Sequence, residues 1–167
     1  MAVILITGGA RSGKSKRAEM RARALAGQPV YVATAEALDA EMEARIARHR
    51  ARRGTDWIER EVPLDLVPAL VATDGGGARL VDCLTLWLSN LMHAERDWER
   101  EASELVTALP RLKSPVVFVT NEVGLGIVPD NALARSFRDA AGFMNQAIAA
   151  VADEVEFVVA GLPMKLK

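Results

Sequence analysis

The segment Gly8-Gly9-Ala10-Arg11-Ser12-Gly13-Lys14-Ser15 matches the pattern G-x-x-x-x-G-K-[ST] in full and is the sharpest signal in the sequence. It follows a compact apolar run, residues 2–6, and precedes residues 14–26, which are rich in good helix formers. A phosphate loop needs this order of strand, glycine-bearing turn and helix, because backbone N–H groups and the helix N-terminus then surround nucleotide phosphates. We therefore expect Lys14 to bridge the β- and γ-phosphates and the Ser15 hydroxyl to coordinate Mg²⁺.

Apolar runs and helical patterns alternate along the rest of the chain. The runs predict strands at residues 2–6, 29–33, 57–62, 79–82, 116–120 and 154–160. Helical patterns cover residues 14–26, 38–53, 64–72, 84–109 and 131–152, the last with Asn131 as its cap. Strands that are apolar throughout and alternate with amphipathic helices indicate a mainly parallel α/β sheet with helices on both faces.

Size and charge restrict the class of protein. The chain has 167 residues, which fits one globular domain over residues 1–167, and its 21 basic and 22 acidic side chains leave a net charge of −1. A protein that wraps a nucleic-acid backbone usually carries a marked basic excess, so we expect no nucleic-acid partner. No signal-peptide pattern and no run near the roughly 20 apolar residues of a membrane span are present. The single cysteine, Cys83, fits a reducing compartment, so we expect a soluble cytoplasmic protein.

A phosphate loop also needs an acidic residue at the end of a neighbouring strand to hold the shell of the Mg²⁺ ion. Asp82 ends one predicted strand, and Glu122 follows another by two residues. We favour Asp82 as the metal-binding residue because its carboxylate comes directly off the strand end, and Glu122 stays open as the alternative. The alternative to metal binding, for Asp82 and for Glu122, is that the residue is only a solvated charge at the end of a strand.

His49 lies within residues 45–53 (RIARHRARR), where five arginines surround it. Clustered positive charge should lower the pKa of the imidazole and keep it neutral and nucleophilic near pH 7. The same guanidinium groups could bind nucleotide phosphates in bidentate fashion. Composition alone favours a simpler interpretation, a solvated basic helix end that carries an incidental histidine.

These segments together resemble one family, the bifunctional adenosylcobinamide kinase/adenosylcobinamide-phosphate guanylyltransferases of cobalamin biosynthesis. The resemblance is carried by GGARSGKS (8–15), RIARHRARR (45–53) with Trp57 and Glu61, VDCLTLWLSNL (81–91), TNEVGLGIVP (120–129), FRDAAGFMNQ (137–146) and ADEVEFVVAGL (152–162). The phosphate loop alone fits many NTPases, but the loop, the RIxxHR segment and TNEVGLGIVP in this order are highly specific.

The resemblance implies two reactions and a set of residues for them. A nucleoside triphosphate, ATP or GTP, phosphorylates the aminopropanol hydroxyl of adenosylcobinamide. GTP then guanylylates His49 with release of pyrophosphate, and GMP passes from His49 to adenosylcobinamide phosphate to give adenosylcobinamide-GDP. The family's fold is a RecA-like phosphate-loop NTPase, and similar proteins assemble as homotrimers. The implied nucleotide contacts are Gly8, Gly9, Ala10, Arg11, Ser12, Gly13, Lys14, Ser15, Thr34, Ala35, Glu36, Arg50, Ala51, Arg52, Arg53, Glu61 and Asp82, with Lys14 and His49 catalytic. Residues 95–109 match no segment of the family.

Two other functions compete with this interpretation. A GTP-binding regulatory protein would need N-K-x-D and D-x-x-G segments, but Glu122 follows Asn121, and Cys83-Leu84-Thr85 follow Asp82. A monofunctional small-molecule kinase would use the phosphate loop without a covalent intermediate on His49. Labelling of the histidine by GTP separates the kinase from the bifunctional enzyme.

Overall fold

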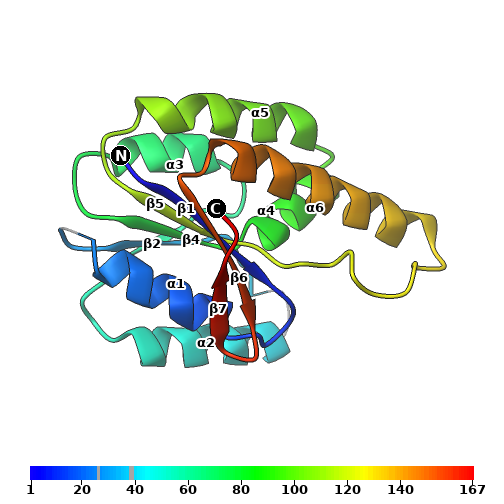
Figure 1. Cartoon of the computed structure of the whole chain (residues 1–167), viewed down its shortest axis with the longest axis horizontal. Coiled ribbons are helices and arrows are strands. Elements are labelled where there is room, and N and C mark those ends of the chain that lie inside the picture. Colours follow the sequence, from blue (N-terminus) through cyan, green and yellow to red (C-terminus); the bar gives the residue numbers. More distant parts are fainter. Residues whose placement is uncertain (26, 38–39) are drawn as a thin grey trace.

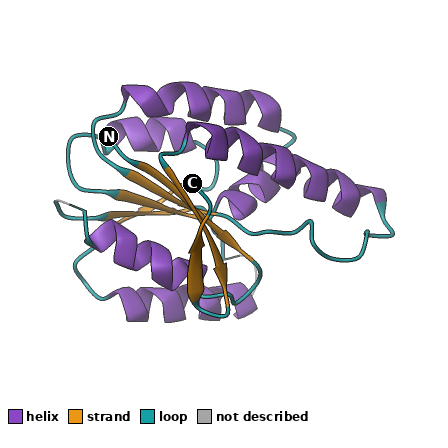
Figure 2. Cartoon of the chain, in the orientation of Figure 1, coloured by secondary structure: helices purple, strands orange, loops and turns teal. Residues whose placement is uncertain are grey.

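The structure is a computed structural model that describes residues 1–25, 27–37 and 40–167, with the side chains of residues 41, 45 and 52 also outside the description. Its centre is a seven-stranded sheet in the order β3-β2-β4-β5-β1-β6-β7. Helices cover both faces of this sheet, α1 and α2 on one side and α3 to α6 on the other (Figures 1 and 2). The predicted α/β arrangement is confirmed.

The helices and strands follow the predicted order. The strands are β1 (Val3–Gly8), β2 (Val30–Ala33), β3 (Ile58–Glu61), β4 (Arg79–Asp82), β5 (Val116–Val119), β6 (Glu154–Val159) and β7 (Leu162–Lys165). The helices are α1 (Lys14–Arg23), α2 (Ala40–Arg53), α3 (Leu66–Ala72), α4 (Leu84–His93), α5 (Trp98–Ala108) and α6 (Ala132–Val151), with a 3₁₀ turn at Leu109–Arg111. Leu38, the predicted start of the second helix, lies outside the described residues.

The central strands are buried because they are apolar on both faces. Ile4 and Ile6 of β1 face the side of the sheet that holds α1, and Val3 and Leu5 face the side that holds α4 to α6. β5 is buried along its whole length. All strand pairs are parallel except β6 with β7, which confirms the mainly parallel sheet.

Two parts of the chain differ from the prediction. Residues 84–109 form two helices rather than one, because Glu95 adopts a left-handed conformation (φ 53°) and the side chain of Asp97 then caps α5 by accepting a hydrogen bond from Arg100 N. The last predicted strand corresponds to β6, whereas the structure adds β7, which pairs antiparallel with β6 at the edge of the sheet. Pro163 has no N–H to donate and is tolerated there because an edge strand has an unpaired side.

The topology gathers several loops at one edge of the sheet. β1 pairs with β5 on one side and with β6 on the other, and β4 lies between β5 and β2. The segments that follow these parallel strands therefore meet at the carboxyl edge, where ligands bind in open α/β sheets.

Candidate functional site

The phosphate loop is held by close backbone contacts with its neighbours. A Cβ atom at Gly8 would lie 2.5 Å from the carbonyl oxygen of Val158. Gly13, just before α1, has a φ of 96°, which L side chains rarely adopt. Glu122 N donates to Gly8 O at 3.0 Å, and Gly161 N donates to Ser12 O at 2.8 Å. The glycines of the motif are thus required by packing and by backbone conformation.

The Lys14 side chain lies against the phosphate loop, where it could contact a bound phosphate group. Its side chain is buried, and Nζ donates a hydrogen bond to the carbonyl oxygen of Gly9 at 2.9 Å. Among the described residues, the buried Ser12 hydroxyl has no hydrogen-bond partner. A loop that surrounds an ammonium group and offers a hydroxyl and helix N–H groups is suited to an anion.

A cavity of about 570 Å³ opens beside this loop. Its volume is in the range of small-molecule and cofactor sites. Predicted residues from separate elements line it: Lys14, Ser15, Ala35, Glu36, His49, Arg50, Arg53, Glu61 and Asp82. The fold therefore brings the phosphate loop and the histidine helix to one cavity.

Asp82 lies at the centre of the polar contacts in this cavity. Its Oδ2 accepts a hydrogen bond from the Tyr31 hydroxyl at 3.0 Å and lies 3.9 Å from Nδ1 of His49. Burial and the charge of Asp82 raise the pKa of Tyr31, so this hydroxyl stays protonated and donates. Asp82 can thus orient the imidazole through Nδ1 and leave Nε2 for chemistry.

The second acidic candidate points elsewhere. An oxygen of the Glu122 carboxylate accepts the N–H of Gly124 at 2.5 Å, within its own loop. Asp82 lines the cavity together with Ser15, whereas Glu122 is not among the lining residues. The geometry favours Asp82 over Glu122 as the partner of a phosphate-bound ion.

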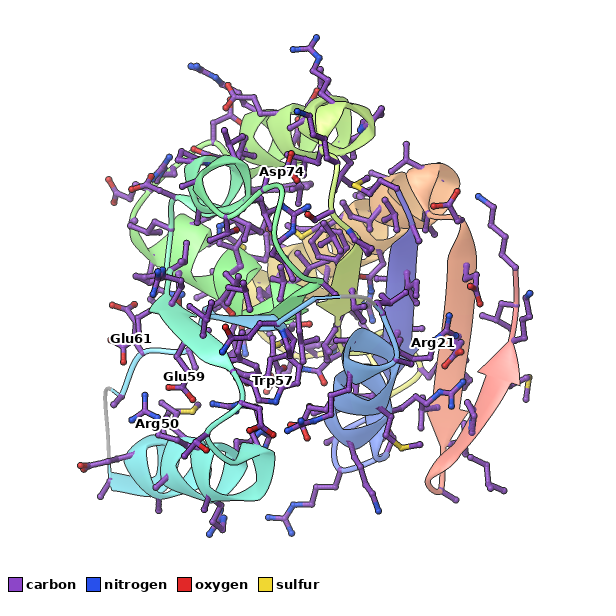
Figure 3. The ribbon with its side chains drawn as sticks, turned by 90° about the vertical axis from the view of Figure 1, so that its left-hand side faces the viewer. Arg21, Arg50, Trp57, Glu59, Glu61 and Asp74 are labelled. Atoms are coloured by element: carbon purple, nitrogen blue, oxygen red, sulfur yellow. The ribbon has the colours of Figure 1, made fainter. Side chains whose placement is uncertain are left out.

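The arginines of α2 are tied to strand β3. Glu59 accepts hydrogen bonds from Arg50 at 2.7 Å and from Arg53 at 2.6 Å, and Figure 3 shows Arg50 and Glu59 between α2 and β3. The Arg53 guanidinium carbon also lies 3.4 Å from the centre of the Tyr31 ring. Burial raises the pKa of Glu59, but the hydrogen bonds and charges of the two arginines outweigh it and hold this pKa below its usual value. These contacts fix the end of α2 that follows His49.

Some predicted contact residues lie outside the cavity. Thr34 is buried, and its hydroxyl donates to Cys83 O and accepts from Cys83 N, both at 2.8 Å, so it joins the ends of β2 and β4. Ala51 is exposed and does not line the cavity. Ala10 and Arg11 are exposed on the phosphate loop. Arg52 is named by the family resemblance, but its side chain lies outside the described part of the chain.

Several residues that line the cavity are not among the predicted site residues, and Tyr31 and Asn121 are two of them. The sequence predicts Tyr31 only as part of an apolar strand, although a hydroxyl in a strand next to the one that carries Asp82 is a signal that could identify it. Asn121 lines the cavity, and its N–H donates to Thr85 Oγ1 at 2.7 Å.

Cys83 is buried as expected, and burial together with the charge of Asp82 raises the pKa of its thiol to about 11.

Comparison with known proteins shows to which family the chain belongs. The family described as cobinamide kinase / cobinamide phosphate guanyltransferase matches residues 4–166. The chain belongs to this family. It is 50% identical over 169 residues to the bifunctional adenosylcobalamin biosynthesis protein CobP of Pseudomonas aeruginosa, covering 98% of this chain and 96% of the relative. It is 46% identical to the protein CobU of Salmonella typhimurium, covering 99% of each chain.

Solved structures confirm the fold class of this cobinamide kinase family member. The flagellar accessory protein FlaH of Methanocaldococcus jannaschii matches with a TM-score of 0.59 at 15% identity, covering 99% of this chain and 78% of that chain. A KaiC-like protein of Pyrococcus horikoshii matches with a TM-score of 0.51 at 14% identity, covering 93% of this chain and 70% of that chain. At such low identity these likenesses support only the fold, and the predicted RecA-like phosphate-loop architecture is confirmed.

Family membership also decides between the competing functions. The resemblance inferred from the motifs is confirmed, and with it a transferase that combines a kinase with a guanylyltransferase. A monofunctional kinase and a GTP-binding regulatory protein are not favoured.

Proposed function

We propose that this chain uses one phosphate loop for both reactions and His49 as the guanylylated residue. In the first reaction ATP or GTP phosphorylates the aminopropanol hydroxyl of adenosylcobinamide. In the second, GTP guanylylates His49, and GMP is transferred to adenosylcobinamide phosphate. The observation that carries the proposal is that Lys14, Ser15 and His49 line one cavity.

In the guanylylation step, Nε2 of a neutral His49 attacks the α-phosphorus of GTP. A nitrogen–phosphorus bond forms while the bond to pyrophosphate breaks, and pyrophosphate leaves in line with the attack. Lys14 and the loop N–H groups stabilise the negative charge that builds on the leaving group. Asp82, 3.9 Å from Nδ1, holds the ring and stabilises its positive charge.

In the transfer step, a phosphate oxygen of adenosylcobinamide phosphate attacks the same phosphorus. The nitrogen–phosphorus bond breaks, and its electron pair returns to the imidazole, which is again neutral. The product is adenosylcobinamide-GDP. In the kinase reaction the same loop presents the γ-phosphoryl group to the acceptor hydroxyl.

The donor set of the cavity fits Mg²⁺. Within the described residues no cluster of three or more His, Cys, Asp or Glu side chains could hold a metal by itself. Mg²⁺ usually takes one or two protein oxygens and completes its shell with phosphates and water, which matches the Ser15 hydroxyl and the Asp82 carboxylate. When bound, the ion neutralises phosphate charge.

We propose that the chain acts as a cytoplasmic homotrimer. Support comes from apolar side chains on the edge strand β7 and after it, where Met164 is 56% exposed and Leu166 is 60% exposed. No helix in the described part of the chain is both long and apolar enough to cross a bilayer. Sedimentation velocity of the purified chain tests the trimer.

Labelling with GTP tests the covalent step. After incubation with GTP labelled at the α-phosphate and denaturation, we expect label that is stable to base and lost in acid, as a phosphoramidate is. H49N should carry no label and should still phosphorylate adenosylcobinamide. Wild-type protein that phosphorylates adenosylcobinamide without covalent label, or H49N that keeps the label, would overturn the assignment.

A further inference from the structure

Two segments flank the phosphate loop because β1 lies between β5 and β6 in the sheet. The segment that follows β5 is tied to the loop by the hydrogen bond from Glu122 N to Gly8 O at 3.0 Å. The turn that follows β6 is tied to it by the hydrogen bond from Gly161 N to Ser12 O at 2.8 Å. These two segments are therefore surfaces directly beside a nucleotide that binds on this loop.

The segment after β5 presents apolar side chains to solvent. We call residues 123–128 the aliphatic loop. Leu125 is 82% exposed, Ile127 is 97% exposed and Val128 is 61% exposed. Figure 1 shows this part of the chain, in yellow between β5 and α6, reaching away from the body of the molecule. Exposed aliphatic side chains gathered in so short a segment indicate a binding surface.

Hydrogen bonds hold both ends of the aliphatic loop. At the start, the carbonyl oxygen of Asn121 accepts a bond from Asn145 Nδ2 at 3.3 Å. At the far end, Arg135 Nη1 donates to Pro129 O at 2.9 Å, and Asn131 Oδ1 accepts from Ala134 N at 2.7 Å to cap α6. The aliphatic side chains are therefore presented from fixed ends, which lowers the entropy lost when a ligand binds them.

The chemical structure of the acceptor calls for an apolar surface beside the phosphate loop. Cobinamides are corrin macrocycles with methyl groups on their faces and amide side chains around the rim, and the hydroxyl that is phosphorylated sits on a short arm. That hydroxyl must come within about 3–3.5 Å of the phosphorus atom that it attacks. Because the arm is short, the macrocycle must lie against the protein surface directly beside the phosphate loop.

We propose that the aliphatic loop is the surface that binds the corrin macrocycle of the acceptor. Asn121 lines the nucleotide cavity, and the loop begins two residues later, so this surface is continuous with the nucleotide site. On the other flank of the phosphate loop, Ala160 and Gly161 are small and exposed, which leaves room for the macrocycle. A second copy of the chain is the competing occupant, but β7 offers apolar surface for that contact away from the aliphatic loop.

This inference rests on the proposed use of one phosphate loop for both reactions, and a double substitution tests it. L125S/I127S removes two exposed side chains without opening a cavity in the core. V71S, which changes an exposed side chain at the end of α3, is the matched control. Adenosylcobinamide binding is measured by equilibrium dialysis with corrin absorbance as the readout, and its KM is measured in the kinase reaction. Thermal melting and sedimentation velocity check folding and assembly.

We expect the double variant to raise the Kd and the KM for adenosylcobinamide at least about tenfold, because it lacks two aliphatic side chains that the bound macrocycle would bury. Labelling of the protein by GTP alone involves no corrinoid and should stay within about twofold of wild type. V71S should match wild type in every assay. Rescue of binding by L125M/I127V, which restores apolar surface, supports a direct contact.

Two results would overturn the inference. One is unchanged adenosylcobinamide affinity in a folded L125S/I127S variant. The other is loss of affinity together with a change in sedimentation, which would assign the aliphatic loop to contact between copies. Failure of the proposed histidine chemistry is recognised separately, because it would abolish covalent labelling in wild type and in every variant alike.

Discussion

The phosphate loop and helix α2 both contribute residues to the cavity, and they are held in different ways. Backbone contacts hold the phosphate loop: Gly8 lies against Val158, and Gly161 N bonds to Ser12 O. Side-chain contacts hold α2: Arg50 and Arg53 bond to Glu59, and Arg53 lies over Tyr31. The phosphate loop is therefore fixed by the fold itself, whereas the position of His49 depends on a few charged and aromatic side chains.

Removal of Lys14 should have the largest effect on activity, because the residue belongs to the phosphate loop that we propose for both reactions. K14A takes away a buried cation that would stabilise charge on the phosphates, so we expect kcat of the kinase and of guanylylation to fall at least about a hundredfold. Initial rates with labelled nucleotides measure both.

The matched control for K14A is K16A, which removes an exposed lysine two residues along. K16A should stay within about twofold of wild type, as surface substitutions usually do. If K14A spared guanylylation while it stopped the kinase, the two reactions would not share the loop.

The second largest effect should come from a substitution of Glu59, which holds α2 but not the phosphate loop. E59Q removes the charge that pairs with Arg50 and Arg53 and loosens the helix end that follows His49. A misplacement of about 1 Å can cost a hundredfold, so we expect guanylylation to slow roughly tenfold to a hundredfold while kinase KM for the nucleotide changes little.

The exposed ion pair of Arg100 and Glu104 on α5 offers the control for E59Q. E104Q should leave both activities and the melting temperature unchanged, because exposed pairs contribute little. Equal loss of both activities in E59Q would instead indicate that the contacts of Glu59 support the whole cavity.

The phosphate loop can be predicted from the sequence more fully than the surroundings of His49, because the loop is a local motif and the contacts near His49 join distant segments. The phosphate loop follows from a local motif between a strand and a helix, so residues 8–15 were identified from sequence. The position of Asp82 at the end of a strand also follows from local order. Tyr31 could not be assigned, because its contacts with Asp82 and Arg53 come from segments far apart in the chain. The composition of residues 84–109 predicts a largely helical segment but not the left-handed turn at Glu95 that divides it.

A smaller effect should follow from Y31F, which removes only the hydroxyl that bonds to Asp82. Supporting hydrogen bonds of this kind typically tune activity tenfold or more, so we expect guanylylation to slow about tenfold. The apolar ring that lies beneath Arg53 is retained, so the melting temperature should change little. Guanylylation rates and thermal melts of Y31F and Y31L separate the hydroxyl from the ring, since only Y31L should also lose stability.

The smallest effect on activity should come from a substitution that loosens α1, the helix that follows the phosphate loop. Glu156 of β6 bonds to Arg17 at 2.7 Å and also to Arg21, whose position on α1 is visible in Figure 3. The hydrogen bond from Arg17 outweighs burial and lowers the pKa of Glu156 in the folded chain. A lowered pKa stabilises the fold at pH values above the unfolded glutamate pKa of about 4.3, and this stability is lost as pH falls through the folded pKa.

E156Q should therefore lower the free energy of unfolding by about 1 kcal/mol at pH 7 and by progressively less below about pH 4. Urea unfolding of wild type and E156Q at neutral and acid pH measures the difference. A constant difference at all pH values would mean that packing, and not the charge of Glu156, holds α1. Guanylylation by E156Q should stay within about threefold of wild type, because the phosphate loop keeps its own backbone contacts with the segment after β5 and with the turn after β6.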